Sequence, residues 1–295
     1  MASYLRSNER MKKLVIFGAL FVVSEAFSQQ LTRRDALSTV GIATASFPSI
    51  ALAGDSLATK LSKKDPAALK NSVFNLPPSA QIFPDWMKGS WQVTSKYGGY
   101  LFPSKAIPRD RLTQDFAIPG FQKCSIAGTS DVGLDRVDYQ MTILENGLED
   151  RQSTLASQIN AHLGYDAVAH VLYDARSNPN RISVDFVDYK TINAERIELF
   201  INGREQEVVH RDGVPTFLHS EYTRQVTFGT GSTVGIPRQV GGNYAHFWTW
   251  RQVDENHLTG NLLTAAYLDP QDSLFFDEPS KPVAVYSHVL SATRI

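Results

Sequence analysis

The chain has 295 residues, of which 42% are hydrophobic and 20% are charged, and this composition suits one globular domain with processing segments. Residues 1–53 hold six basic and three acidic side chains. Removing them from totals of 29 and 30 leaves 23 basic and 27 acidic residues, a net charge of −4. A mildly acidic domain lacks the basic footprint that nucleic acid requires. The single cysteine, Cys124, excludes an internal disulfide and a cysteine-based zinc site.

Residues 1–26 are predicted to be a signal peptide. The apolar run Leu14–Val23 follows Lys12–Lys13. It is too short to span a membrane and has the form of a secretory signal. The Ala26–Phe27 pair that follows resembles the cleavage motif of bipartite leaders in algae with secondary, red-lineage plastids.

A second targeting signal is predicted in residues 27–53, as a plastid transit segment with a twin-arginine lumenal signal. Arg33–Arg34 precede the weakly apolar stretch Ser38–Ala51, and Ala51–Leu52–Ala53 supplies the small residues of a peptidase site. A bacterial precursor would leave two consecutive apolar signals unexplained. We therefore expect a thylakoid-lumen protein that is cleaved after Ala53. No apolar run of spanning length follows, so the mature protein is expected to be soluble, without a transmembrane span.

Residues 54–80 are rich in lysine, alanine and proline, which predicts an N-terminal arm with a short helix, or a disordered spacer, followed by a linker. The sequence pattern changes in residues 81–295, where apolar and polar residues alternate with the period of half-buried strands. The alternating segments are residues 137–143, 182–186, 218–228, 244–253, 257–268 and 283–295.

One turn signal and one helix complete the pattern. The segment Ile197–Ile201 runs into Asn202–Gly203, a dipeptide typical of type I′ turns, which predicts a hairpin returning through Val208–Val209. Only Asp150–Leu163 has helical spacing, with Gly164 as a stop. Many short strands and one substantial helix indicate a mainly β, antiparallel domain. Aromatic residues on both faces of Tyr244–Val253 favour a closed barrel.

The stretch Phe83–Ser95 is the most distinctive in the chain. It resembles the opening of an uncharacterised family of cyanobacteria and plastids, Pro-x-Trp-x-x-Gly-x-Trp-x-Val-Thr-Ser. Further pieces agree with that family along residues 80–290. They are Pro119–Phe121, Ile159–Gly164, Asn178–Arg181, Ala266–Asp272 and Pro282–Tyr286. The resemblance implies no activity and therefore no catalytic residue.

Gly89–Ser90–Trp91 is also similar to the Gly-x-Trp motif that opens the first strand of lipocalins. This resemblance implies a lipocalin-like, calycin-type barrel in which Trp91 closes one end. It also implies that Arg294, on the last strand, stacks on the Trp91 ring. Gly89 lets the chain turn into the first strand.

No constellation of residues indicates catalysis, and none indicates a metal site or a particular cofactor. The segment Gly229–Gly235 lacks the Gly-Lys-Ser/Thr ending of a phosphate loop. The seven histidines have no metal-type spacing. In His219–Ser220–Glu221, neighbouring strand residues point to opposite faces and cannot form a triad. The carboxylates, including Glu198 and Glu205, are expected on solvated surfaces.

Several aromatic residues either fill the core or line a ligand cavity. They are Trp91, Tyr222, Trp248 and Tyr286, and His288 shares a strand face with Tyr286. Two functions follow from these alternatives. The protein binds a small apolar ligand, such as a lipid, a carotenoid or a tetrapyrrole, or it is a non-enzymatic accessory or assembly factor that docks on the lumenal face of a photosynthetic complex.

Overall fold

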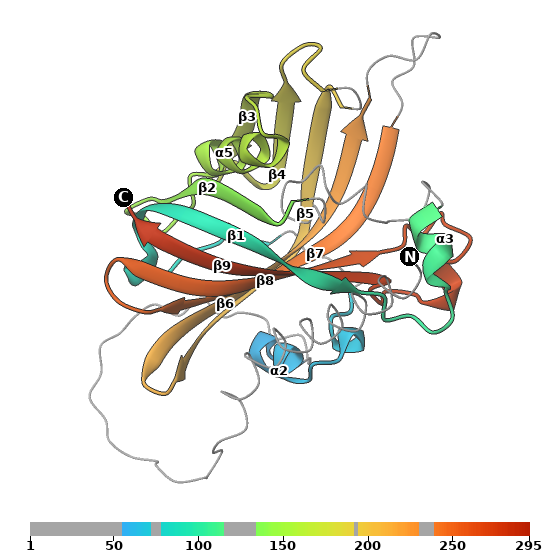
Figure 1. The fold of residues 1–295 in the computed structure, drawn as a ribbon, viewed down its shortest axis with the longest axis horizontal. Helices are drawn as coiled ribbons and strands as arrows, with labels where there is room; N and C mark the ends of the chain where they lie inside the picture. The colour runs from blue at the N-terminus through green and yellow to red at the C-terminus, as the bar shows by residue number, and fades with distance from the viewer. Residues whose placement is uncertain (1–54, 72–77, 115–133, 192–193, 230–238) are drawn as a thin grey trace, which may run out of the picture.

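The fold is one antiparallel sheet of nine strands, with few helices (Figure 1). The computed structural model describes residues 55–71, 78–114, 134–191, 194–229 and 239–295. The predicted leader, Cys124 and most of the glycine-rich loop lie outside these residues. The strand order is β2-β1-β9-β8-β7-β6-β5-β4-β3. The strands are β1 (Gly89–Leu101), β2 (Arg136–Ile143), β3 (Val168–Asp174), β4 (Asn178–Phe186), β5 (Arg196–Arg211), β6 (Val214–Phe228), β7 (Gln239–Gln252), β8 (His257–Tyr267) and β9 (Ala284–Arg294).

The predicted helix is confirmed as α5 (Arg151–Leu163). The Asp150 side chain caps its start by accepting a hydrogen bond from the Ser153 amide at 3.3 Å. Gly164 ends the helix in a left-handed conformation, with φ of 79°. The other described helices are shorter: α2 (Leu57–Ser62), α3 (Arg109–Gln114), and the 3₁₀ turns η1 (Pro66–Ala68), η2 (Asp85–Met87) and η4 (Phe275–Asp277). No helix in the described part of the chain is long and apolar enough to cross a membrane.

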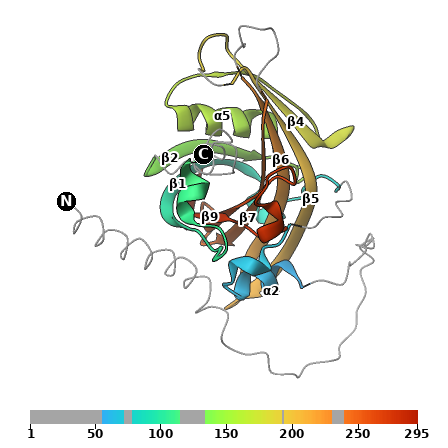
Figure 2. The same ribbon diagram turned by 90° about the vertical axis from the view of Figure 1, so that its right-hand side faces the viewer.

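The antiparallel β class is confirmed, but the sheet does not close into the expected barrel. Its edge strands, β2 and β3, are at opposite ends of the strand order. The segment that joins them contains α5, which packs against both strands, and Figure 2 shows this helix lying over β2. A helix therefore covers the edges that a barrel would join by hydrogen bonds. Whether a sheet closes into a barrel depends on the elements that lie between its two edge strands. The alternation of apolar and polar residues within each strand carries no information about those elements.

The hairpin predicted at Asn202–Gly203 is wrong. Strand β5 continues through this dipeptide for 16 residues, with a bulge between Ile201 and Gly203. The chain turns instead at Asp212 and Gly213, where φ is 52° and 76°. These are the positive values that a type I′ turn requires. Continuous pairing with β6 on both sides of the bulge outweighs the local turn preference of Asn-Gly.

The two faces of the sheet carry separate cores. The inner face, toward which α5 packs, carries Trp91, Val93, Phe217 and Trp250. The outer face carries Leu218, Tyr222, Phe247 and Tyr267, which alternate with inner residues and pack against Leu57, Leu61 and Leu69. Helix α2 is thus docked on the sheet. Lys60 Nζ in α2 lies 2.7 Å from Glu205, and the Tyr267 hydroxyl donates at 2.5 Å to the carbonyl of Leu69, which follows η1.

The predicted contact between the first and last strands is confirmed. Trp91 pairs with Arg294 across β1 and β9, and the guanidinium carbon lies 4.2 Å from the ring centroid. The buried indole N–H donates to the Met87 carbonyl at 2.8 Å. Arg294 also donates to the carbonyls of Lys88 at 2.6 Å and Glu255 at 2.9 Å. At Gly89, where φ is 107°, a Cβ would lie 2.5 Å from the Arg294 Nη1. Only glycine fits this position.

The Arg294→Lys variant is expected to lose about 1–2 kcal/mol of unfolding free energy. Lysine keeps the charge but neither stacks flat on the indole nor reaches both carbonyls at once. Urea unfolding followed by tryptophan fluorescence measures the loss. Arg176→Lys, at an exposed loop position, is the matched control and should change stability by less than about 0.5 kcal/mol. Equal effects of the two substitutions would show that the contact with Trp91 contributes no stability.

Candidate functional site

Two rows of side chains cross the strands in the middle of the inner face. Cross-strand partners share a face, so the strand register defines both rows. The first, called the polar row, is Arg204, Glu221, His246, Thr264 and Tyr286. The second, called the aromatic row, is His219, Trp248, Leu262, His288 and Tyr97.

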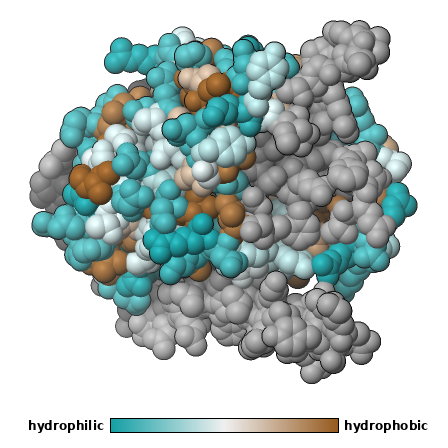
Figure 3. All heavy atoms as spheres, turned by 45° about the horizontal axis from the view of Figure 1, so that its top comes forward, coloured by the Kyte–Doolittle hydropathy of each residue, from teal (hydrophilic) through white to brown (hydrophobic). Residues whose placement is uncertain are grey.

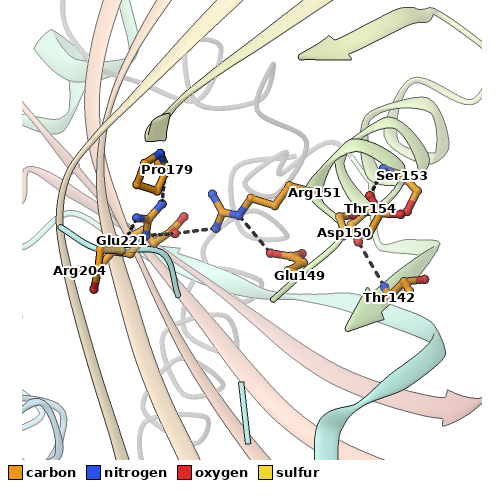
Figure 4. A network of polar contacts seen from close by, with 10 residues as sticks. Thr142, Glu149, Asp150, Arg151, Ser153, Thr154, Pro179, Arg204 and Glu221 are labelled. Atoms are coloured by element: carbon orange, nitrogen blue, oxygen red, sulfur yellow. Dashed lines mark hydrogen bonds and ion pairs between the residues drawn. The ribbon is translucent and has the colours of Figure 1, made fainter. Parts of the chain in front are cut away.

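Glu221 is the charged centre of the polar row. Its Oε1 accepts hydrogen bonds from Arg151 Nη2 at 2.5 Å and from Arg204 Nε at 2.7 Å. Arg151 reaches across from the start of α5 and also pairs with Glu149 at 3.2 Å (Figure 4). Arg204 further donates to the Pro179 carbonyl at 2.7 Å. Two arginines thus face two glutamates, so the network carries no formal net charge and ties α5 to the sheet.

The protonation of Glu221 follows from these contacts. The carboxylate is only 4% exposed, and such burial would raise its pKa. The guanidinium groups of Arg151 and Arg204 outweigh burial and lower the pKa of Glu221 to about 2. For Glu149, burial prevails over the attraction of Arg151 and raises the pKa of the carboxyl. Glu221 is therefore ionised at neutral pH and held by both arginines.

His219, in the aromatic row, is packed between rings. Its imidazole stacks on Trp248 with centroids 4.5 Å apart and on Phe217 at 5.0 Å. Phe83 meets it edge-on at 5.2 Å. The residue is 4% exposed, and neither ring nitrogen has a hydrogen-bond partner within the described part of the chain. Burial lowers the pKa of His219 to about 3, so the ring is neutral.

The neighbouring groups in the two rows are imidazoles and hydroxyls. The His246 Nδ1 lies 2.9 Å from the Thr264 hydroxyl, and burial lowers the pKa of His246 to about 3. The buried ring of His288 meets Tyr97 edge-on at 5.6 Å. The Tyr97 hydroxyl is buried without a hydrogen-bond partner among the residues described, and burial raises its pKa. The site thus offers aromatic surface and neutral hydrogen-bonding groups.

The five residues proposed from the sequence to contact a ligand do not all come together. Trp248, Tyr286 and His288 lie in the two rows. Trp91 shares their face but is fully buried against Arg294, at one end of the sheet. Tyr222 lies on the outer face, in contact with Phe247 and Tyr267. The alternation of β6 requires this, because Glu221 next to it points inward.

Sequence reasoning missed the charged network and His219. Opposite faces for neighbouring residues exclude a triad within residues 219–221, but the same alternation places His219 and Glu221 on one face. That signal was available in the sequence. Glu198, expected on a solvated surface, is also buried, and it accepts hydrogen bonds from Arg181 at 3.0 Å and Ser183 at 2.8 Å. Among the described residues, no group of three or more His, Cys, Asp or Glu side chains is placed to hold a metal ion.

Comparison with protein families gives one match. The family model of a domain of unknown function, DUF6816, matches residues 76–295. This segment contains the nine described strands, α5 and both rows. Comparison with curated proteins and with solved structures finds no significant match. Because the family model covers well over half of the chain, the protein belongs to the family of DUF6816, a domain of unknown function.

Proposed function

We propose that the inner face of the sheet binds a small, largely apolar molecule, such as a lipid, a carotenoid or a tetrapyrrole. The observation that carries this proposal is His219, a buried neutral imidazole inside an aromatic stack, whose two nitrogens have no hydrogen-bond partner among the described residues. Buried polar groups in proteins are nearly always hydrogen-bonded, so two nitrogens without a partner in the described chain are suited to hydrogen-bond a ligand. The Tyr97 hydroxyl lies in the same row and also has no hydrogen-bond partner in the part of the chain that the structure describes.

The chemistry of the two rows supports a ligand that is mostly apolar with a polar group. The rings of Trp248 and His288 provide apolar and aromatic contact surface. The charged residues are neutralised within the network of Glu221, which leaves neutral imidazoles and hydroxyls to orient a ligand. Ligand sites in proteins combine these two elements. A lipocalin-like role is an analogy that rests on the contact between Trp91 and Arg294, and fold alone does not give function.

The alternative role, an accessory or assembly factor, would need a broad apolar surface for docking. Exposed apolar side chains do occur, including Tyr189, Leu172 and Phe276. On the face in Figure 3, the apolar residues drawn in brown lie in several separate places between hydrophilic ones. No feature of that face in the described chain favours a docking role over ligand binding.

The test is extraction of bound ligand from native protein, followed by mass spectrometry. We expect a small apolar molecule at near-stoichiometric occupancy, and at least a tenfold lower occupancy in His219→Phe and Tyr97→Phe. Both variants remove polar atoms without breaking a described hydrogen bond. Tyr222→Phe, on the outer face, is the matched control and should retain the ligand. Native protein that is folded but carries no ligand would contradict the proposal.

We also propose that the protein acts in the thylakoid lumen, on the basis of Arg33–Arg34 and the site after Ala53. Replacing both arginines by lysine should block entry into the lumen, which protease protection of isolated thylakoids measures. Replacing Arg6 and Arg10 by lysine is the control and should leave delivery unchanged. N-terminal sequencing should find a start at Gly54. A mature start at Phe27 would place the protein in the stroma instead.

A further inference from the structure

Residues 55–71, called the docked arm, pack on the outer face of the sheet as a separate unit. The arm contains α2 and η1, contributes no strand, and lies on the side of the sheet away from α5 (Figure 1). Among the described residues, one backbone–backbone hydrogen bond joins it to the rest of the chain, from the Asn71 amide to the Ser280 carbonyl at 2.9 Å. The family domain begins at residue 76, after the arm. The docked arm can therefore leave the sheet without breaking a strand pair.

The sheet surface beneath the docked arm is apolar. Leu57, Leu61 and Leu69 of the arm are buried against side chains of the outer face. These side chains are Leu218, Tyr222, Phe247, Tyr267 and Val285. Because α2 has only six residues, it would not be stable as an isolated helix, so its contacts with the sheet hold it in shape. Without the arm, the family domain would expose an apolar patch of the kind that marks a protein interface.

The rim of this patch recognises the docked arm through polar contacts. Both carboxylate oxygens of Glu205 lie 2.7 Å from Lys60 Nζ. Glu207 accepts a hydrogen bond at 3.0 Å from the Ala58 amide, which belongs to the first turn of α2, where a helix leaves its own amides unpaired. The outer face is therefore complementary to this particular arm in apolar contacts, in charge and in hydrogen bonding.

We infer that the outer face is an interface between two copies of this chain, in which each copy receives the docked arm of the other. A second copy carries the same arm, so every contact described above recurs unchanged when the arms are exchanged. Reciprocal exchange gives a closed dimer with two-fold symmetry. A short tether holds an arm near its own sheet at an effective concentration of about 1 mM, so exchange competes as the protein approaches that concentration. The inference does not depend on the ligand proposed for the inner face.

The first test uses the purified protein, mixed in equal amounts with protein labelled with heavy nitrogen. A carbodiimide joins the Lys60 ammonium to the Glu205 carboxylate, and mass spectrometry shows whether the joined peptides come from one copy or from two. We expect peptide pairs with mixed labels, in a fraction that rises as the protein concentration increases from about 10 μM to about 1 mM. Joined peptides with a single label throughout this range would overturn the inference.

The second test exchanges the charges of the pair. Lys60→Glu and Glu205→Lys each place like charges together when the docked arm stays on its own sheet. When the two variants are mixed, exchange of arms restores both ion pairs. We expect the mixture to dimerise about tenfold or more tightly than either variant alone in sedimentation equilibrium, because two half-buried pairs change from repulsion to attraction. A chain that carries both substitutions restores the pair within itself and should dimerise like the parent protein.

The matched control is the ion pair of Lys281 and Glu278, whose charged atoms also lie 2.7 Å apart but belong to one turn of the chain and cannot be exchanged. A mixture of Lys281→Glu and Glu278→Lys should dimerise no more tightly than either variant alone. If the mixture of arm variants behaves like this control, the arms do not exchange. Dimers that give only single-label joined peptides would place the interface between copies elsewhere and would also overturn the inference.

Discussion

Replacing Glu221 by glutamine is expected to lower the free energy of unfolding at pH 7 by about 3–5 kcal/mol, the usual cost of breaking a buried ion pair. Glutamine has nearly the same shape but carries no charge. The guanidinium groups of Arg151 and Arg204, now bound at 2.5 and 2.7 Å, would face an uncharged amide in a buried setting. The cost arises from these unpaired cations as well as from the lost hydrogen bonds.

Chemical denaturation of Glu221→Gln and of Glu145→Gln measures the effect. Glu145 lies in the exposed turn after β2, so its substitution should change stability by less than about 0.5 kcal/mol. Because Arg151 begins α5, hydrogen exchange in Glu221→Gln should increase in this helix more than in β7. A loss below about 1 kcal/mol, with unchanged exchange in α5, would show that the network does not hold the helix on the sheet.

The elements that the sequence predicted correctly are those whose signals are local. Strand β2 alternates between buried and exposed residues along its whole length, as its apolar pattern predicted. Helix α5 begins at a capping aspartate and ends at Gly164, both of which are visible in the sequence. The contact between Trp91 and Arg294 is the exception, because it joins distant strands and was implied by the resemblance to the Gly-x-Trp motif of lipocalins.

The errors arise where distant segments decide the outcome. Asn202–Gly203 is a strong local turn signal, but β6 pairs with β5 on both sides of it, and the turn occurs at Asp212–Gly213. In the same way, aromatic residues on both faces of one strand show that both faces are buried. They do not show what covers each face. Here α2 covers part of the outer face, and α5 bridges the open edges.

The candidate site was predictable only in part. Strand alternation places Trp248, His246 and His219 on the inner face once the register between β6 and β7 is known. Arg151 and Glu221 are 70 positions apart in the sequence. The periodicity of helices and strands relates only residues a few positions apart, so it could not predict this contact. Buried charge networks of this kind depend on tertiary packing, which a single sequence does not reveal.

Acid is expected to destabilise the protein already below about pH 6.5, which is well above the pH range in which carboxylates titrate. Burial lowers the pKa of His219 and of His246 from 6.5 to about 3. Below pH 6.5 the unfolded chain takes up protons that these two buried imidazoles do not, so stability falls as the pH falls. From pH 7 to pH 5 the loss is about 2 kcal/mol for each histidine, or about 4 kcal/mol together.

Glu221 extends the effect to lower pH. Its pKa is lowered to about 2 in the folded protein, from a reference value of 4.5. A carboxylate with a lowered pKa stabilises the fold above its unfolded pKa, and this contribution is lost between pH 4.5 and 2. Between pH 6.5 and 4.5 the histidines cause the loss, and Glu149 opposes it, because its raised pKa lets the folded protein take up a proton above pH 4.5. Urea unfolding at half-unit pH steps separates the two ranges.

His219→Phe distinguishes this origin from a general effect of acid. Phenylalanine preserves the stacking between Trp248 and Phe217, and no described hydrogen bond is lost because neither nitrogen of His219 makes one. At pH 7 the variant should be as stable as the parent protein. At pH 5 it should be more stable by about 2 kcal/mol, because one of the two acid-sensitive imidazoles is gone. His210→Phe, at an exposed position on β5, should leave the pH dependence unchanged. If His219→Phe loses stability between pH 7 and 5 as steeply as the parent, the imidazole of His219 is not the group that makes the fold sensitive to acid.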